Sequence, residues 1–227
     1  MLSNILSGNL TVQDIPLLLL RIPIILIALT VHETSHGRVA LWLGDTTARD
    51  MGRLSLNPLH HLDPLGAIVM LIFGFGWAKP VPINARRFKN PKIGMALSAL
   101  AGPVSNLLLA FFGLLLLRIL YFFLPEYIAP GFAFYLAAYT IMFLYLFASM
   151  NTALAIFNLL PMPPLDGSRI LFSFLPDKLY FGIMKYERYI AFGIMILLFT
   201  GLLDRPLSFL ISQTLNGMGT LLGLNGL

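Results

Sequence analysis

The chain has 227 residues, of which 58 % are hydrophobic and only 11 % charged, with a mean hydropathy of +0.83. Because soluble domains carry about 25 % charged residues, this composition excludes a soluble fold and indicates an integral membrane protein in contact with the lipid bilayer. The absence of cysteine excludes disulfides, thiolate metal sites and a cysteine nucleophile. The net charge of +5 comes with no basic run interleaved with aromatic residues, so no nucleic acid is expected as a partner.

The first apolar segment predicts a long helix from Ile15 to about Leu43, with Gly44 in the position of a C-cap. At about 1.5 Å per residue this helix is longer than the hydrocarbon core of a bilayer. It lacks the basic start and the cleavage site of a signal peptide and contains Arg21, so we expect it to be retained.

A polar stretch follows, and the next apolar run, from Ala67 to Trp77, is too short to span a membrane, which takes about 20 helical residues. We interpret this run as a re-entrant segment or a β-hairpin lying against the helices. The segment from Lys79 to Lys92 carries five positive charges and no acidic residue, so the positive-inside rule predicts that it is cytoplasmic.

Two long apolar segments, from Gly94 to Leu124 and from Phe132 to Leu160, predict a transmembrane hairpin. The loop from Pro161 to Lys178 would then return to the cytoplasmic side. A further span is expected near Ile183 to Leu203, and Pro206 to Leu227 is either a short span or an interfacial helix.

The expected fold class is therefore all-α. The apolar segments lack the period-two alternation of barrel strands, and a backbone that faces lipid must then satisfy its own hydrogen bonds by forming helices. We predict a polytopic bundle of about four to six transmembrane helices in one domain, residues 1–227, with a core at 15–178 and C-terminal helices at 183–227. If the short apolar run does not cross, the end of the first helix and the loop at Pro161 lie on the same side of the membrane.

Residues His32-Glu33-Thr34-Ser35-His36 form an H-E-x-x-H pattern close to the cytoplasmic end of the first helix. Residues four apart share a helix face, so both imidazoles can bind one metal ion while Glu33 reaches a water molecule on it. His and Glu are rare in this chain, and a chance match is expected in about one such sequence in a thousand. Ionisable residues at membrane depth are costly and usually functional, which favours zinc-dependent hydrolysis over two structural histidines.

Catalytic zinc usually takes three protein ligands and a water molecule, so the two histidines need a partner. Glu126 is expected on the opposite side of the membrane. The remaining candidates are Asp166, Glu187, Asp63, His60 and His61. Asp166 follows prolines that break a transmembrane segment, and such irregular backbone is tolerated only where it is buried or lines a wet cavity. His60 and His61 lie among Asn-Pro and Asp-Pro turns, where we expect them to hold the loop.

Three motifs occur in a fixed order: His32-Glu33-x-x-His36, Ala101-Gly102-Pro103 with Asn106, and Asn158-x-x-Pro161 leading to Leu165-Asp166-Gly167. In this order they resemble the site-2 protease family of intramembrane zinc metalloproteases. The segments 57–64 and 76–82 further resemble its compact prokaryotic branch. The similarity covers roughly residues 24–169, with no insert large enough for a PDZ domain and no nucleotide-binding module after Leu203.

The resemblance implies that His32, His36 and Asp166 bind one Zn²⁺ ion per chain and that Glu33 is the catalytic base. It implies hydrolysis of peptide bonds in or near transmembrane segments of membrane-protein substrates, in regulated intramembrane proteolysis or cleavage of signal-peptide remnants. It also implies a prokaryotic inner or plasma membrane, with the active site toward the cytoplasmic side. Nothing in the sequence indicates the oligomeric state.

A side-chain amide near the metal would stabilise the oxyanion of the reaction. Asn158 is the first candidate and Asn106 the second, although buried asparagines also join transmembrane helices. The segment from Gly74 to Pro82 can present an extended edge to an unwound substrate. The alternative functions are a divalent-metal transporter, which usually has internal repeats that this sequence lacks, and a non-catalytic membrane-protein binder, which would not need Glu33.

Overall fold

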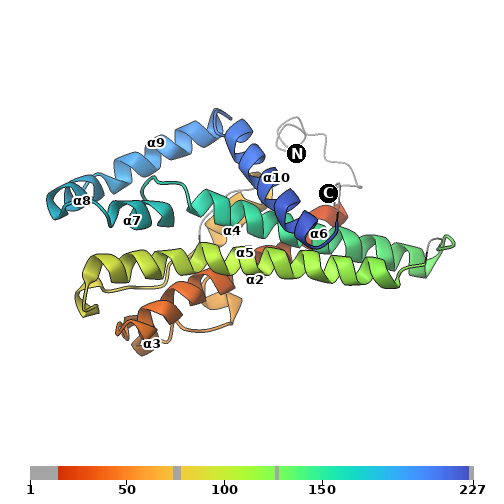
Figure 1. The fold of residues 1–227 in the computed structure, drawn as a ribbon, viewed down its shortest axis with the longest axis horizontal. Coiled ribbons are helices and arrows are strands. Elements are labelled where there is room, and N and C mark those ends of the chain that lie inside the picture. Colours follow the sequence, from red (N-terminus) through yellow and green to blue (C-terminus); the bar gives the residue numbers. More distant parts are fainter. Residues whose placement is uncertain (1–14, 74–77, 126–127, 225–227) are drawn as a thin grey trace.

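A computed structural model describes residues 15–73, 78–125 and 128–224, and all regular structure in these ranges is helical (Figure 1). The predicted all-α class is therefore confirmed. The helices are α2 (Ile15–Trp42), α3 (Thr47–Asp50), α4 (Pro64–Phe73), α5 (Pro91–Phe123), α6 (Phe132–Asn158), α7 (Asp166–Phe172), α8 (Asp177–Met184), α9 (Glu187–Phe199) and α10 (Asp204–Leu221), with the 3-10 turns η2 (Pro58–His60) and η3 (Ala85–Arg87).

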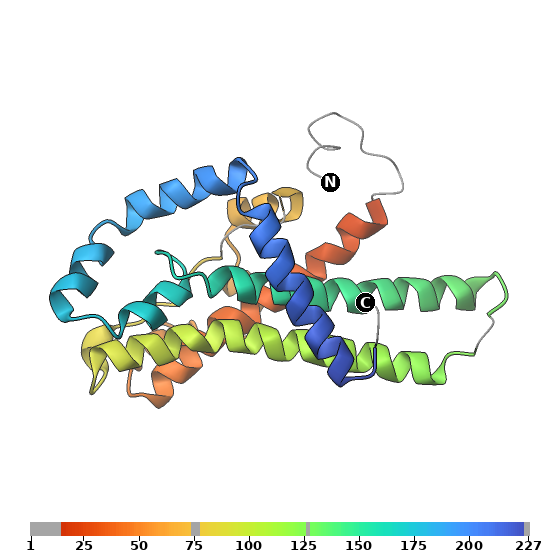
Figure 2. The same cartoon turned by 45° about the horizontal axis from the view of Figure 1, so that its top comes forward.

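Three of the described helices, α2, α5 and α6, are long and apolar enough to cross a membrane. Helix α2 ends where the sequence predicts. The N–H groups of Gly44 and Asp45 donate to the carbonyls of Leu41 (3.1 Å) and Ala40 (2.9 Å), which is the Schellman pattern of a helix C-terminus. Helices α5 and α6 form the predicted antiparallel hairpin (Figures 1 and 2).

The prediction of four to six spans is not met by the described residues. The span expected near residues 183–203 is divided between α8 and α9, and α9 has 13 residues. At about 1.5 Å per residue it is about 20 Å long, shorter than the roughly 30 Å hydrocarbon core. Lys185, Glu187 and Arg188 lie where the helix breaks, and this cluster of charges is costly inside a membrane. Helix α10 is also absent from the candidate spans.

The short apolar run after the first helix is helical, so the β-hairpin alternative is wrong for residues 64–73. The Asp63 carboxylate accepts a hydrogen bond from the N–H of Gly66 (2.9 Å), and Pro64 occupies the first helical position, both of which favour a helix start. With 10 residues α4 is too short to cross, as predicted. Residues 74–77, which belong to the same predicted segment, lie outside the described residues.

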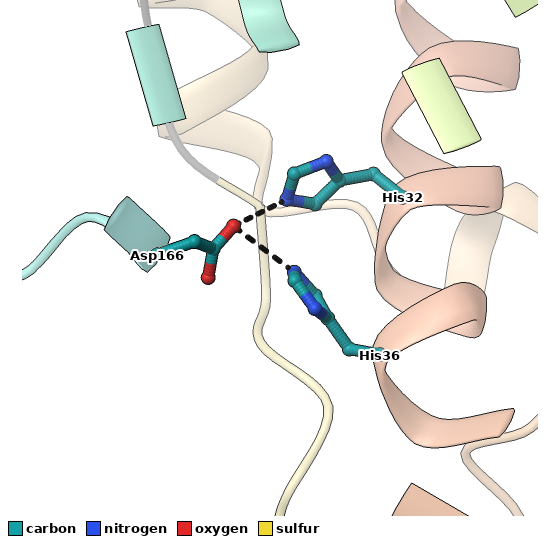
Figure 3. Close-up of side chains that lie close together, drawn as sticks. All are labelled: His32, His36 and Asp166. Atoms are coloured by element: carbon teal, nitrogen blue, oxygen red, sulfur yellow. Dashed lines mark ion pairs between the residues drawn. The ribbon is translucent and has the colours of Figure 1, made fainter. Parts of the chain in front are cut away.

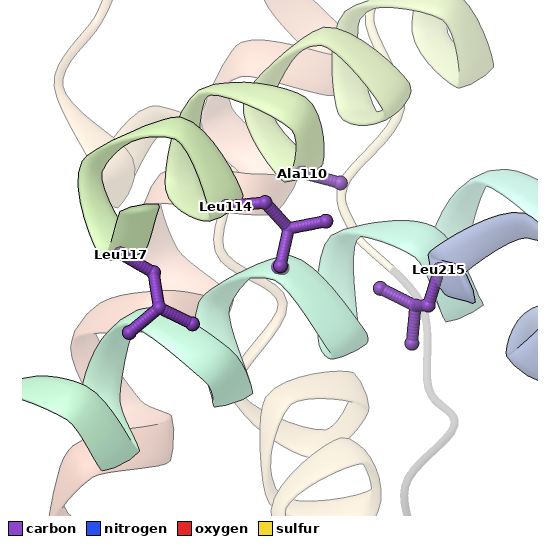
Figure 4. Packing of buried hydrophobic residues seen from close by; sticks show 5 residues of the cluster. Ala110, Leu114, Leu117 and Leu215 are labelled. Carbon is purple, nitrogen blue, oxygen red and sulfur yellow. The ribbon is translucent and has the colours of Figure 1, made fainter. Parts of the chain in front are cut away.

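Helix α5 lies at the centre of the bundle, where it packs against α2, α6 and α7. Helix α10 crosses α5 and α6, and its Leu215 is buried against Ala110, Leu114 and Leu117 of α5 (Figure 4). Helices α8 and α9 connect α7 to α10 along a path that leads away from the bundle (Figure 2). The start of α7 is therefore held on α5, beside the histidines of α2.

Candidate metal centre and active site

His32, His36 and Asp166 meet at one point between α2 and α7 (Figure 3). Oδ2 of Asp166 lies 3.2 Å from Nε2 of His32 and 3.3 Å from Nε2 of His36. Both histidines are buried, and the ligand atoms of the three residues lie within 4.8 Å of one another. Within the described ranges this is the group of His, Asp and Glu side chains that can hold a metal ion.

The second nitrogen of each ring shows which nitrogen carries the proton. Nδ1 of His32 lies 2.5 Å from Oδ1 of Asn106, and Nδ1 of His36 lies 2.7 Å from the carbonyl oxygen of Ser98. Because both partners are acceptors, each Nδ1 must carry a hydrogen. A neutral ring then has its lone pair on Nε2, which is the tautomer that binds a metal.

The arrangement fits a bound cation, because two Nε2 lone pairs and a carboxylate oxygen face one another. Oδ2 of Asp166 is buried and has no hydrogen-bond partner among the described residues. Three electron-rich atoms at this distance repel unless a positive charge lies among them. Nitrogen and oxygen ligands in this number are typical of catalytic zinc.

Two glycines allow the helices to approach closely enough to assemble this group. A Cβ atom on Gly102 of α5 would overlap ring atoms of both His32 and His36. A Cβ atom on Gly167 would overlap the main-chain carbonyls of Leu159 and Leu160, where the backbone turns between α6 and α7. Gly102 therefore lets α5 cover the histidines, and Gly167 lets Asp166 reach them.

A cavity of about 380 Å³ opens beside the three side chains. Glu33, Asn158 and Arg169 line it, and the extended segment 78–83 forms another part of its wall. Oε2 of Glu33 accepts a hydrogen bond from the N–H of Val81 (2.8 Å), so the carboxylate is oriented beside the histidines. The amide of Asn158 donates to the carbonyl of Leu154 (2.9 Å), and its second N–H has no acceptor among the described residues.

The other candidate ligands lie elsewhere. Asp63 caps α4, Glu187 pairs with Arg169 (3.6 Å), and Glu126 lies outside the described residues. His60 is exposed, whereas His61 is buried with Nε2 2.7 Å from the carbonyl of Ser55. Of the candidate third ligands that the structure describes, Asp166 is the one beside the histidine pair.

Asn106 occupies a different place from the one predicted for an oxyanion donor. It is fully buried behind His32 and does not line the cavity, because it lies deep between α2, α5 and α6. Sequence reasoning also missed the N–H of Val81 and the carbonyl of Ser98. Both are main-chain groups, which every residue possesses, although the prolines on both sides of Val81 do mark an unusual backbone.

Comparison with known proteins places the chain in a family. The model of peptidase family M50 matches residues 21–202. A Bacillus subtilis protein named "Putative zinc metalloprotease YwhC" is 42 % identical over 175 residues, 77 % of each chain. A Mycolicibacterium smegmatis protein named "Putative zinc metalloprotease Rip2" is 28 % identical over 185 residues, which are 79 % of this chain and 66 % of that protein. No solved structure matches the chain significantly.

The chain belongs to peptidase family M50, the site-2 protease family, as its ordered motifs predict. It is an integral membrane metalloendopeptidase, and the names of its relatives as zinc metalloproteases indicate that the metal is zinc. The enzyme class and the family are therefore confirmed.

Proposed function

We propose that this protein is an intramembrane zinc endopeptidase that cuts membrane-protein substrates in or near their transmembrane segments. The observation that carries the proposal is the convergence of His32, His36 and Asp166 next to Glu33, with both histidines and Glu33 on the candidate membrane span α2. In this proposal the three side chains hold one zinc ion per chain. The site lies toward the cytoplasmic side of a bacterial inner membrane, because the basic segment 79–92 adjoins it.

Zinc held by His32, His36 and Asp166 would supply an activated water molecule with a pKa of about 7 and a positive charge near the scissile carbonyl. Glu33 takes a proton from the attacking water and later delivers it to the leaving amine. Val81 supports this role because its N–H holds the Glu33 carboxylate in place. Asn158 lines the cavity and keeps one N–H available for the oxyanion, while its other N–H is bonded to the carbonyl of Leu154.

The segment 78–83 forms one wall of the substrate cavity. The sequence predicts that Gly74 to Pro82 presents an extended edge to an unwound substrate. Residues 79–82, however, have few free N–H groups with which to bind a substrate backbone. Pro80 and Pro82 lack an N–H, Val81 donates to Glu33, and Lys79 donates to the carbonyl of His61 (2.9 Å). Arg53 also donates to the carbonyls of Lys79 (2.9 Å) and Pro80 (3.3 Å). We therefore expect this segment to shape the cavity, and not to pair with substrate through residues 79–82.

The proposed function is tested with Glu33→Gln, measured for zinc content and for cleavage of a substrate with one transmembrane segment in reconstituted vesicles. Glu33→Gln should keep stoichiometric zinc and lose cleavage by at least a hundredfold, since proton transfer contributes about 10² to 10⁴ in rate. Asp166→Ala should lose zinc. Residual wild-type cleavage in Glu33→Gln would contradict the role of Glu33. A transporter would instead move zinc across the vesicle membrane without cutting the substrate.

A further inference from the structure

Two asparagines on neighbouring helices are completely buried within the bundle. Asn106 of α5 and Asn151 of α6 are both 0 % exposed. Nδ2 of Asn106 donates to Oδ1 of Asn151 (2.9 Å). Burying two amides in an apolar interior is costly unless their hydrogen bonds are satisfied, so their partners are informative.

Main-chain carbonyls determine which end of each side-chain amide is the oxygen and which is the NH₂ group. Nδ2 of Asn151 donates to the carbonyl of Phe147 (2.8 Å), which leaves Oδ1 of Asn151 as an acceptor. Nδ2 of Asn106 donates to the carbonyl of Ala28 (3.2 Å) as well as to Asn151. Carbonyls can only accept, so neither amide can be flipped without losing a bond. Oδ1 of Asn106 must therefore face Nδ1 of His32.

The chain of bonds ends on a proposed metal ligand. It runs from Phe147 through Asn151 and Asn106 to His32, and it fixes both the rotation of the His32 ring and the proton on Nδ1. His36 is oriented by the Ser98 carbonyl, a main-chain group. The two histidines therefore differ, because only the support of His32 depends on side chains that can be exchanged.

We propose that Asn106 and Asn151 are positioning residues that keep His32 in the orientation and tautomer required for zinc binding. This inference rests on the proposed zinc site. It assigns Asn106 directly to His32, and Asn151 acts through Asn106. A pair of asparagines that merely joined α5 to α6 would affect helix packing and leave metal affinity unchanged.

The magnitudes follow from the geometry. Loss of a group that orients a metal-binding histidine typically weakens metal affinity about 10- to 100-fold, so Asn106→Leu should weaken zinc binding by that factor. Asn151→Leu should have a smaller effect, because Asn106 retains its bond to the carbonyl of Ala28. Asn106→Asp retains an acceptor for Nδ1 of His32 and should bind zinc within a few-fold of the wild-type affinity.

A matched control lies next to Asn151 on the same helix. Thr152 is also 0 % exposed, but its hydroxyl donates to the carbonyl of Ala148 on its own helix (2.9 Å). Thr152→Val therefore removes a buried polar group of similar depth without touching the chain to His32. It should retain the zinc affinity of the wild type.

The test uses the full-length protein in detergent. The zinc Kd is measured by competition with a chelator, the absorption spectrum is recorded with Co²⁺, and the melting temperature is measured without metal. We expect zinc affinity to fall in the order wild type and Thr152→Val, Asn106→Asp, Asn151→Leu, Asn106→Leu, with an altered Co²⁺ spectrum in the last two. If Asn106→Leu does not fold, Asn151→Leu and Asn106→Asp still provide the test.

Two outcomes would overturn the inference. Asn151→Leu and Asn106→Leu could lower the melting temperature of the metal-free protein and still bind zinc as the wild type does, which would reduce the pair to helix packing. If wild-type protein binds no zinc at all, both the proposed function and this inference fail. Zinc binding by the wild type with unaffected variants contradicts only the positioning role.

Discussion

The region around the two metal-site histidines and the connecting helices α8 and α9 are built differently. Around the histidines, α2, α5 and α7 pack closely, and the second nitrogen of each histidine ring has an acceptor. Along α9, large side chains such as Tyr189 (77 % exposed) and Phe192 (65 %) face outward. The contrast shows that close packing and defined side-chain orientation occur where the candidate metal ligands meet. Helices α8 and α9 mainly connect α7 to α10. The same kind of substitution should therefore have different consequences in the two regions.

The largest expected difference in zinc affinity is between two glycine-to-alanine variants, one in each region. Gly102→Ala places a methyl group against both histidine rings, and overpacking of this kind costs about 1–3 kcal/mol. If that cost falls on the metal-binding geometry, zinc binding should weaken by about fivefold to somewhat over a hundredfold, and cleavage should fall with it. Gly193→Ala on α9 is the control, because apart from its two chain neighbours and the adjoining helix backbone no described atom lies within 4 Å of its Cβ position. It should be neutral or slightly stabilising. Equal zinc affinity in both variants would contradict the close packing of α5 on the histidines.

A medium effect is expected at Val81, where only the main chain reaches Glu33. Val81→Pro removes the N–H group that donates a hydrogen bond to the Glu33 carboxylate. A hydrogen bond to a charged group contributes about 1.5–3 kcal/mol, so kcat should fall about tenfold or more while zinc stays stoichiometric. Val81→Ala keeps the N–H and should remain close to wild type. Kinetics in vesicles together with zinc analysis distinguish the two variants, and an active Val81→Pro enzyme would show that Glu33 needs no such support.

The smallest effect is expected at the ion pair that joins the two regions. Arg169 of α7 and Glu187 of α9 are 3.6 Å apart, and each side chain is about one third exposed (31 % and 33 %). Partly exposed pairs of this kind contribute at most about 1 kcal/mol. Glu187→Gln should change the melting temperature little and leave the zinc Kd unchanged. A clear loss of zinc affinity would instead mean that α9 helps to hold α7, and with it Asp166.

The sequence allowed much of the fold to be predicted, but not its C-terminal part. The three long apolar helices and the end of α2 at Gly44 follow from local composition and capping. The span expected near residues 183–203 does not allow for the charges of Lys185, Glu187 and Arg188, and the helix breaks there. The apolar run from Ala67 to Trp77 is compatible with a re-entrant segment or a β-hairpin, because periodicity distinguishes helix from strand poorly in a short apolar run.

At the site, the positions of His32 and His36 on one face are a property of the helix itself, because a spacing of four residues is local. The approach of Asp166 was suggested by a family resemblance and is a consequence of how α7 packs on α5. The link from Asn106 to His32, the carbonyl at Ser98 and the N–H at Val81 emerged only in the folded chain. Such contacts join distant segments or use main-chain atoms common to all residues, so packing alone decides them.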